Sequence, residues 1–155
     1  AVAEAVRASG SVARLSLTAN NVGDEGAAAL ARAVRASTSL TSLHVYANDI
    51  GDKGAAALAQ ALEAGAPLAV LSLNNNDIGD AGAAALAKAL KKSTALKELY
   101  LLGNDFGAKG AIALAEALKA NTSLTTMSVD GEEVGDEGKA ALTAAKGPGL
   151  TINGI

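Results

Sequence analysis

Few side chains in this sequence could perform catalysis, and they are isolated from one another. His44 is the only histidine among the 155 residues, and there is no cysteine. A catalytic triad or a zinc site needs several such groups close together, so His44 by itself predicts neither. We therefore expect no enzymatic activity, no cofactor and no bound metal.

A glycine-rich segment recurs five times, with two glycines three positions apart, as at Gly79 and Gly82. It superficially resembles a phosphate-binding loop, but the spacing and the lysine of a P-loop are missing, and five copies favour an architectural role. We expect the first glycine to adopt positive φ and the second to permit close backbone approach. We expect the aspartate after the first glycine to be the N-cap of its own helix. These aspartates are Asp24, Asp52, Asp80 and Asp136; Ala108 breaks the series, so we expect a less stable helix near residue 109.

A second acidic position precedes each glycine segment. A row of such side chains could attract a basic partner or calcium. The alternative is a solvated rim that keeps a repetitive protein soluble, and we favour this interpretation. The position is occupied by Asn21, Asp49, Asp77, Asp105 and Glu133.

These segments belong to a 28-residue repeat that opens at Val12, Leu40, Leu68, Leu96 and Leu124, with a sixth opening at Ile152. A fixed period of this length is typical of a solenoid. Because residue 1 falls within the helix of a repeat, we expect the natural chain to extend upstream, and we interpret the irregular C-terminus as a natural end. The prediction is one domain over 1–155: a partial repeat at 1–11, repeats at 12–39, 40–67, 68–95, 96–123 and 124–151, and a capping strand at 151–155.

Each repeat contains a short strand, a bend and a helix. Alternation over Val70–Leu73 predicts a strand, and Leu86 and Leu90, four residues apart, predict a helix that faces the core. Asn76 stands at the bend, where a buried amide can bond to unpaired backbone groups. We expect strand centres at Leu15, Leu43, Leu71, Leu99 and Met127, helices near 25–36, 53–64, 81–92, 109–120 and 137–146, and a ladder of Asn20, Asn48, Asn76 and Asn104.

Successive strand–helix units predict a parallel sheet with right-handed crossovers. Parallel strands lie about 4.8 Å apart whereas packed helices need about 8–10 Å, so the stack must curve with the sheet inside and the helices outside. The pattern LxxLxLxxNxIGDxGAxALAxAL runs through essentially the whole chain and resembles the ribonuclease-inhibitor-like leucine-rich repeats. This resemblance implies an α/β leucine-rich-repeat solenoid, a right-handed horseshoe that binds proteins through its concave sheet and adjoining loops. Asn20, Asn48, Asn76 and Asn104 fill the asparagine position of that pattern, and Glu132 departs from it.

Composition excludes several classes of partner. The net charge is -3 and the sequence pI about 5.1, so there is no basic surface for nucleic acid. No stretch is long and apolar enough for a membrane span. Secreted solenoids often carry disulfide caps, so the absence of cysteine favours an intracellular, cytoplasmic location. A consensus-designed array would be as regular, but Phe106, Ala108 and Glu132 favour a natural sequence.

The expected binding surface is the inner face of the sheet, where equivalent residues of the repeats form rows. Both tyrosines and the only histidine fall on this face. Tyrosine offers a large contact area and a hydroxyl group, which suits a protein-binding hot spot, although exposed tyrosines could also simply cover the sheet. We expect a shallow slot with bulky walls and a polar floor. The predicted partner-binding residues are Arg14, His44, Tyr46, Val70, Ser72, Asn74, Glu98, Tyr100, Leu102 and Asp130.

The favoured function is a protein–protein interaction scaffold, acting alone or as part of a larger chain or multi-subunit assembly. Two alternatives stay open. One is a regulator of a small GTPase, as the family resemblance to the Ran GTPase-activating protein implies. The other is a purely structural subunit of a large complex.

Overall fold

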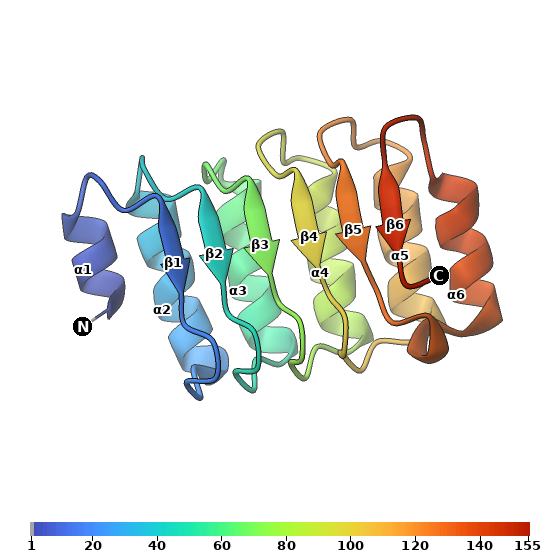
Figure 1. Ribbon diagram of the computed structural model, residues 1–155, viewed down its shortest axis with the longest axis horizontal. Coiled ribbons are helices and arrows are strands. Elements are labelled where there is room, and N and C mark those ends of the chain that lie inside the picture. Colours follow the sequence, from blue (N-terminus) through green and yellow to red (C-terminus); the bar gives the residue numbers. More distant parts are fainter. Residues whose placement is uncertain (1) are drawn as a thin grey trace.

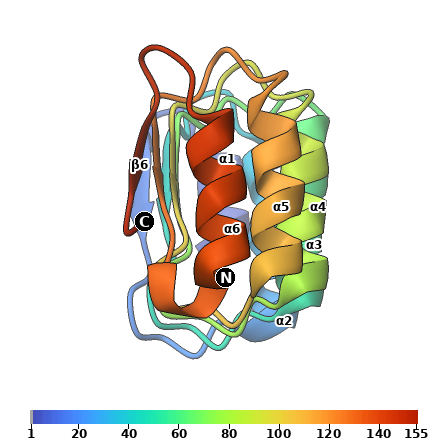
Figure 2. The ribbon, with the colours of Figure 1, turned by 90° about the vertical axis from the view of Figure 1, so that its right-hand side faces the viewer.

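The computed structural model describes residues 2–155 and consists of two layers, a sheet and a row of helices (Figures 1 and 2). Six strands form one parallel sheet in the order β1-β2-β3-β4-β5-β6, and the helices cover one of its faces. The strands are β1 (Arg14–Ser16), β2 (Ser42–His44), β3 (Val70–Ser72), β4 (Glu98–Tyr100), β5 (Thr126–Ser128) and β6 (Thr151–Asn153). The helices are α1 (Val2–Ala8), α2 (Gly23–Ala36), α3 (Asp52–Glu63), α4 (Asp80–Leu90), α5 (Ala108–Leu118) and α6 (Gly131–Ala145).

The first five strands lie where the sequence places them, centred on the predicted hydrophobic residues. Because the repeat length is constant, equivalent residues pair directly across β1 to β5, as Leu43 does with Leu71. The last connection is different. Ile152 pairs with Met127, 25 residues earlier, whereas the other strand partners lie 28 residues apart. The predicted sixth opening at Ile152 is therefore wrong, since this residue is a strand centre reached through a shortened connection.

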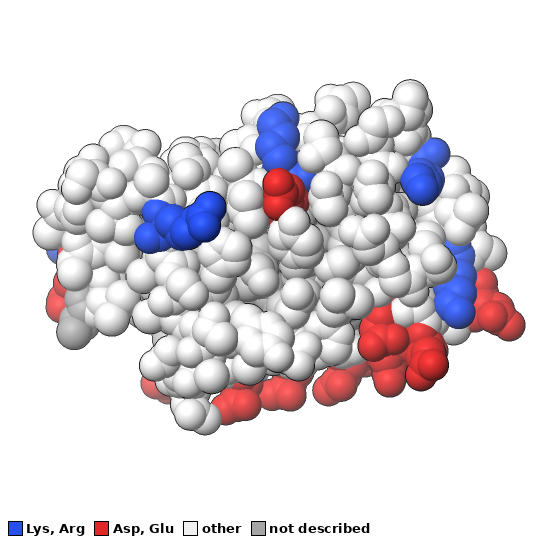
Figure 3. Space-filling view, in the orientation of Figure 1, with Lys and Arg blue, Asp and Glu red and all other residues white. Residues whose placement is uncertain are grey.

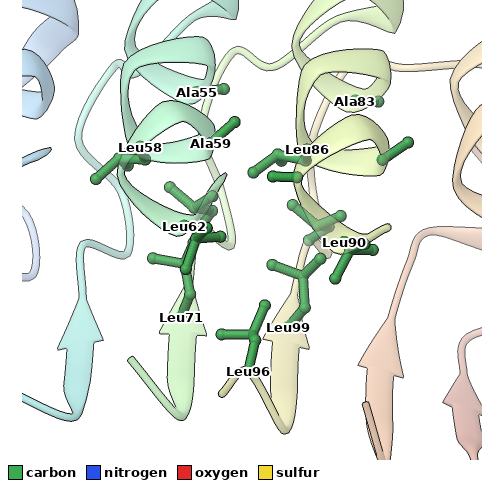
Figure 4. Packing of buried hydrophobic residues seen from close by; sticks show 14 of the residues in the cluster. Ala55, Leu58, Ala59, Leu62, Leu71, Ala83, Leu86, Leu90, Leu96 and Leu99 are labelled. Atoms are coloured by element: carbon green, nitrogen blue, oxygen red, sulfur yellow. The ribbon is translucent and has the colours of Figure 1, made fainter. Parts of the chain in front are cut away.

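The core lies between the two layers and is built from leucine and alanine (Figure 4). Leu58 and Leu62 of α3 and Leu86 and Leu90 of α4 are at most 1% exposed, and Leu71 of β3 is fully buried. The small alanines between these leucines let neighbouring helices pack closely along the row. This packing holds the strands side by side and leaves the opposite face of the sheet uncovered (Figure 2).

Buried asparagines connect each repeat to the one before it. The Oδ1 atom of Asn48 accepts hydrogen bonds from the backbone N–H groups of Asn20 (3.0 Å) and Val22 (3.1 Å), and its Nδ2 donates to two backbone carbonyls. Asn76 and Asn104 occupy the same place in the next two repeats and are also buried. The predicted ladder is confirmed for these three residues. It is wrong for Asn20, which is exposed because no described strand lies on that side of β1.

The repeated aspartates also act between repeats. Oδ1 of Asp52 accepts from the backbone N–H groups of Gly79 (2.8 Å) and Gly82 (2.7 Å), at the start of α4. Asp24 and Asp80 do the same for α3 and α5. The prediction that each aspartate caps its own helix is wrong. Asp52 is the first residue of α3, past its N-cap, so its carboxylate reaches the next helix instead.

In the three middle segments the second glycine leaves space for the carboxylate of the preceding repeat, which confirms the predicted close approach there. A Cβ atom on Gly82 would lie 2.7 Å from Oδ1 of Asp52 and 3.1 Å from its Cα. The first glycine departs from the prediction. Gly51 and Gly79 have extended, negative-φ conformations, and positive φ occurs only in the first and last copies, at Gly23 and Gly135.

The C-terminal helix shows the consequence of the missing aspartate. Asp80 caps α5, so the prediction of a weakened helix near residue 109 is wrong. Because each cap acts on the next repeat, Ala108 instead leaves the following helix without a cap from the preceding repeat. That helix, α6, begins at Gly131, ahead of the predicted residue 137. It is capped by Asp130, whose Oδ1 accepts from the Glu132 N–H at 3.0 Å. Two helical segments meet at a kink at Gly135 (φ 63°).

Candidate functional site

The uncovered face of the sheet, called the sheet face below, carries little charge. Among the strand residues that point toward it, only Arg14 and Glu98 have a formal charge, and they lie on β1 and β4. In Figure 3 most of this face is uncharged, apart from isolated basic groups and one acidic group that lies directly below a basic one, and acidic side chains follow the edge below the C-terminal ends of the strands. The sheet face therefore differs in chemistry from the rim beside it.

A shallow groove of about 370 Å³ crosses the sheet face from β1 to β4. It brings together seven of the ten predicted residues and adds Ser42, which the prediction left out. Ser42 pairs in register with both Arg14 and Val70, so its row in the repeat alignment was the signal that could have found it. The groove is lined by Arg14, Ser42, His44, Val70, Ser72, Asn74, Glu98 and Tyr100.

Three predicted residues lie outside this groove. Tyr46 and Leu102 follow the ends of β2 and β4, and they are 40% and 38% exposed. The Tyr46 hydroxyl accepts a hydrogen bond of 3.2 Å from the Nδ2 of Asn75. The Asp130 carboxylate caps α6, so its position has a structural explanation. His44 and Tyr100 are thus the bulky side chains within the groove, while Tyr46 and Leu102 extend the surface beyond it.

The polar floor of the groove is partly committed to internal hydrogen bonds. Ser42 and Ser72 are buried, at 6% and 7% exposed. The Ser42 hydroxyl lies 2.9 Å from Nε2 of His44, two residues along the same strand. Oδ1 of Asn74 accepts from the backbone N–H of Leu102 at 2.8 Å. These bonds fix the rotamers of the floor, so a ligand would meet an ordered surface.

Glu98 and Tyr100 are joined by a hydrogen bond on the sheet face. The tyrosine hydroxyl donates to Oε2 of Glu98 at 2.5 Å. This hydrogen bond, assisted by partial burial and the nearby negative charge, raises the pKa of Tyr100 above its ordinary value. The carboxylate is thereby held over the sheet next to an aromatic ring, where it can accept a further donor.

The acidic rim has no feature of a metal site. The rim position holds one exposed carboxylate in each repeat after the first, which has Asn21 there, and residues 2–155 contain no cluster of three or more His, Cys, Asp or Glu side chains that could hold a metal ion. One rim contact does link neighbouring repeats: Nδ2 of Asn21 donates to Oδ2 of Asp49 at 2.8 Å. None of helices α1 to α6 in the described chain is long and apolar enough to cross a membrane.

Comparison with known proteins gives matches in both sequence and structure. A family profile described as "Leucine Rich repeat" matches residues 11–31, 36–59, 67–87 and 92–115, which together make up more than half of the chain. The chain is also similar to a solved structure described as "Leiomodin-1 Actin-Binding Site 2 (ABS2)", with a TM-score of 0.80 and 21% sequence identity. That match covers 92% of this chain and 84% of the other, and at this identity it supports the fold alone. No curated protein gives a significant match.

Proposed function

The chain belongs to the leucine-rich repeat family, and on this basis we propose that it binds a protein partner through its sheet face. The observation that carries the proposal is the groove across β1 to β4, whose polar side chains are already ordered by hydrogen bonds. An ordered surface loses little side-chain entropy on binding, which favours a specific interaction.

Exposed bulky side chains beside the groove also support the sheet face as the binding surface. Tyr46 and Leu102 are among the few large hydrophobic residues that are exposed in the described chain. Such residues contribute strongly to protein–protein affinity when a partner buries them. The similar leiomodin-1 structure is described as an actin-binding site, which is in line with a protein-binding role for this architecture.

The proposed role is non-enzymatic and intracellular. The groove contains His44 and one carboxylate, Glu98, and the carboxylate is engaged by Tyr100. A cytoplasmic setting rests on the absence of cysteine from the sequence, since the disulfides common in secreted solenoids cannot form. The acidic rim also disfavours a nucleic-acid partner.

Site-specific photo-crosslinking tests this proposal. Benzoylphenylalanine would replace Tyr46 or Leu102 on the sheet face, and matched controls would carry it in place of the exposed Arg35 of α2 or the exposed Lys91 directly after α4. Each variant would be irradiated in an extract of the source cells, with purified actin as a separate arm. We expect the same protein to crosslink from both sheet-face positions and from neither control.

Crosslinks from the helical positions alone would contradict the proposal and would support a structural subunit that packs through its outer surface. Circular dichroism of the four variants would verify that each retains the fold. A crosslinked small GTPase would be followed by a GTP-hydrolysis assay, since the GTPase-regulator alternative predicts stimulated hydrolysis.

A further inference from the structure

The two charged residues that line the groove point to one kind of ligand. We propose that the groove binds an extended peptide segment that crosses the strands and carries an acidic and a basic side chain four residues apart. The acidic residue contacts Arg14 and the basic residue contacts Glu98. This inference rests on the proposed function, because it specifies the partner chemistry of the same groove.

The spacing follows from the register of the sheet. Arg14 pairs with Ser42, Ser42 with Val70, and Val70 with Glu98, so the two charged residues lie in one row across β1 to β4. Three steps between neighbouring strands span about 14 Å. An extended chain advances about 3.4 Å per residue, so residues four apart are separated by about 14 Å as well.

The alternation of side chains along an extended peptide agrees with a spacing of four residues. Residues at positions i and i+4 point to the same side, as does the residue at i+2. That middle residue lies over Ser42 and Val70, where the floor is uncharged and one side chain is apolar. We expect a small or apolar residue there, since a charge would lose hydration without gaining a partner.

Both charged ends of the groove are available to a ligand. Arg14 is exposed and forms no ion pair within residues 2–155, and Glu98 is half-buried with one carboxylate oxygen accepting from Tyr100. The second oxygen of Glu98 remains free for a lysine or arginine of the ligand. A helical ligand fits less well, because residues four apart on a helix are separated by about 6 Å.

A peptide panel tests the inference directly. Fluorescein-labelled 13-residue peptides of alanine, serine and threonine would each contain one glutamate and one lysine, at spacings from two to ten and in both orders. Fluorescence anisotropy at low ionic strength would report binding, since salt screens exposed ion pairs. We expect the tightest binding at spacing four, by at least about threefold, the effect typical of exposed ion pairs.

Substitutions assign each contact. Arg14→Gln should weaken the binding of the peptide with glutamate, but it should not change the binding of a peptide in which glutamine replaces that glutamate. Glu98→Gln should likewise weaken the binding of the peptide with lysine, but not of a peptide in which glutamine replaces that lysine. Arg35→Gln and Glu137→Gln, exposed on α2 and α6, are matched controls and should leave binding unchanged.

Several results would overturn the inference. These are equal binding at all spacings, an optimum near ten that indicates a helical ligand, unchanged binding by the Arg14 and Glu98 variants, or no detectable binding of any peptide. Crosslinking from Tyr46 and Leu102 would still succeed in those cases if the sheet face binds a partner of different chemistry. The two proposals can therefore fail separately.

Discussion

At the scale of single residues, the repeated aspartates show how one side chain serves a neighbouring repeat. Asp52 bonds to two backbone N–H groups at the start of α4, and these groups would otherwise lack partners within the helix. Asp136 occupies the equivalent position in α6, where the described chain has no further helix to cap. The same residue type in the same local sequence thus has different energetic roles.

This difference gives a paired prediction. Asp52→Ala should lower the free energy of unfolding by about 1 kcal/mol, the usual cost of losing a helix cap. Asp136→Ala should cost less than about 0.5 kcal/mol, as expected of a surface change. Urea denaturation followed by circular dichroism measures both values. Equal losses would mean that each aspartate stabilises its own helix, contrary to the hydrogen bonds described above.

The Glu98–Tyr100 hydrogen bond makes a second prediction at this scale. A Tyr46→Phe variant has Tyr100 as its only tyrosine, so ultraviolet absorbance at 295 nm reports its ionisation alone. Because the hydrogen bond raises the pKa of Tyr100, its midpoint should lie above the ordinary value of about 10. Any stability from this bond is present below the ordinary pKa and is lost as the pH rises through the raised one.

The matched variant carries Glu98→Gln in addition to Tyr46→Phe. Its titration midpoint should fall toward the ordinary value, since the negative acceptor and its charge are removed. An unchanged midpoint would show that Glu98 and Tyr100 are apart in solution, and the groove would then lack an ordered carboxylate.

At the scale of elements, the strands were predictable and the helix boundaries were less so. Strand centres follow from the spacing of apolar residues in the sequence, because the residue at the centre of each strand must face the core. The start of α6 was missed because Gly135 marks a bend in the repeat pattern, whereas the helical turn before it depends on the Asp130 cap. The shortened last connection does not follow from the constant period, because only residues 146–150 connect α6 to β6, compared with residues 119–125 between α5 and β5.

Packing within α4 makes the third prediction. Leu86→Ala should lower the free energy of unfolding by about 2–5 kcal/mol, because it removes a fully buried side chain and leaves a cavity. Lys91→Ala, at the exposed end of the same helix, should be nearly neutral. Thermal or urea denaturation ranks the two, and a larger loss for Lys91 would reverse the assigned faces of the helix.

At the scale of the whole molecule, the solenoid converts a repeat in sequence into rows of side chains on one face. This regularity made most of the groove predictable, because residues 28 positions apart become neighbours across the sheet. The rest depended on contacts that a repeat alignment does not contain. Asp130 shares a row with Tyr46 and Leu102, yet its carboxylate caps α6. Tyr46 shares this row with Asn74, which lines the groove, but Tyr46 lies outside it and its hydroxyl accepts a hydrogen bond from Asn75.

The affinity of the crosslinked partner for alanine variants tests the central claim, that the sheet face is the binding surface. Tyr46→Ala and Tyr100→Ala should each weaken binding by at least about 1 kcal/mol, or about fivefold in Kd, and leave the melting temperature nearly unchanged. Isothermal titration calorimetry gives the Kd, with Lys91→Ala as the control on the helical side. Unchanged affinity in both tyrosine variants, together with a loss in Lys91→Ala, would contradict the account.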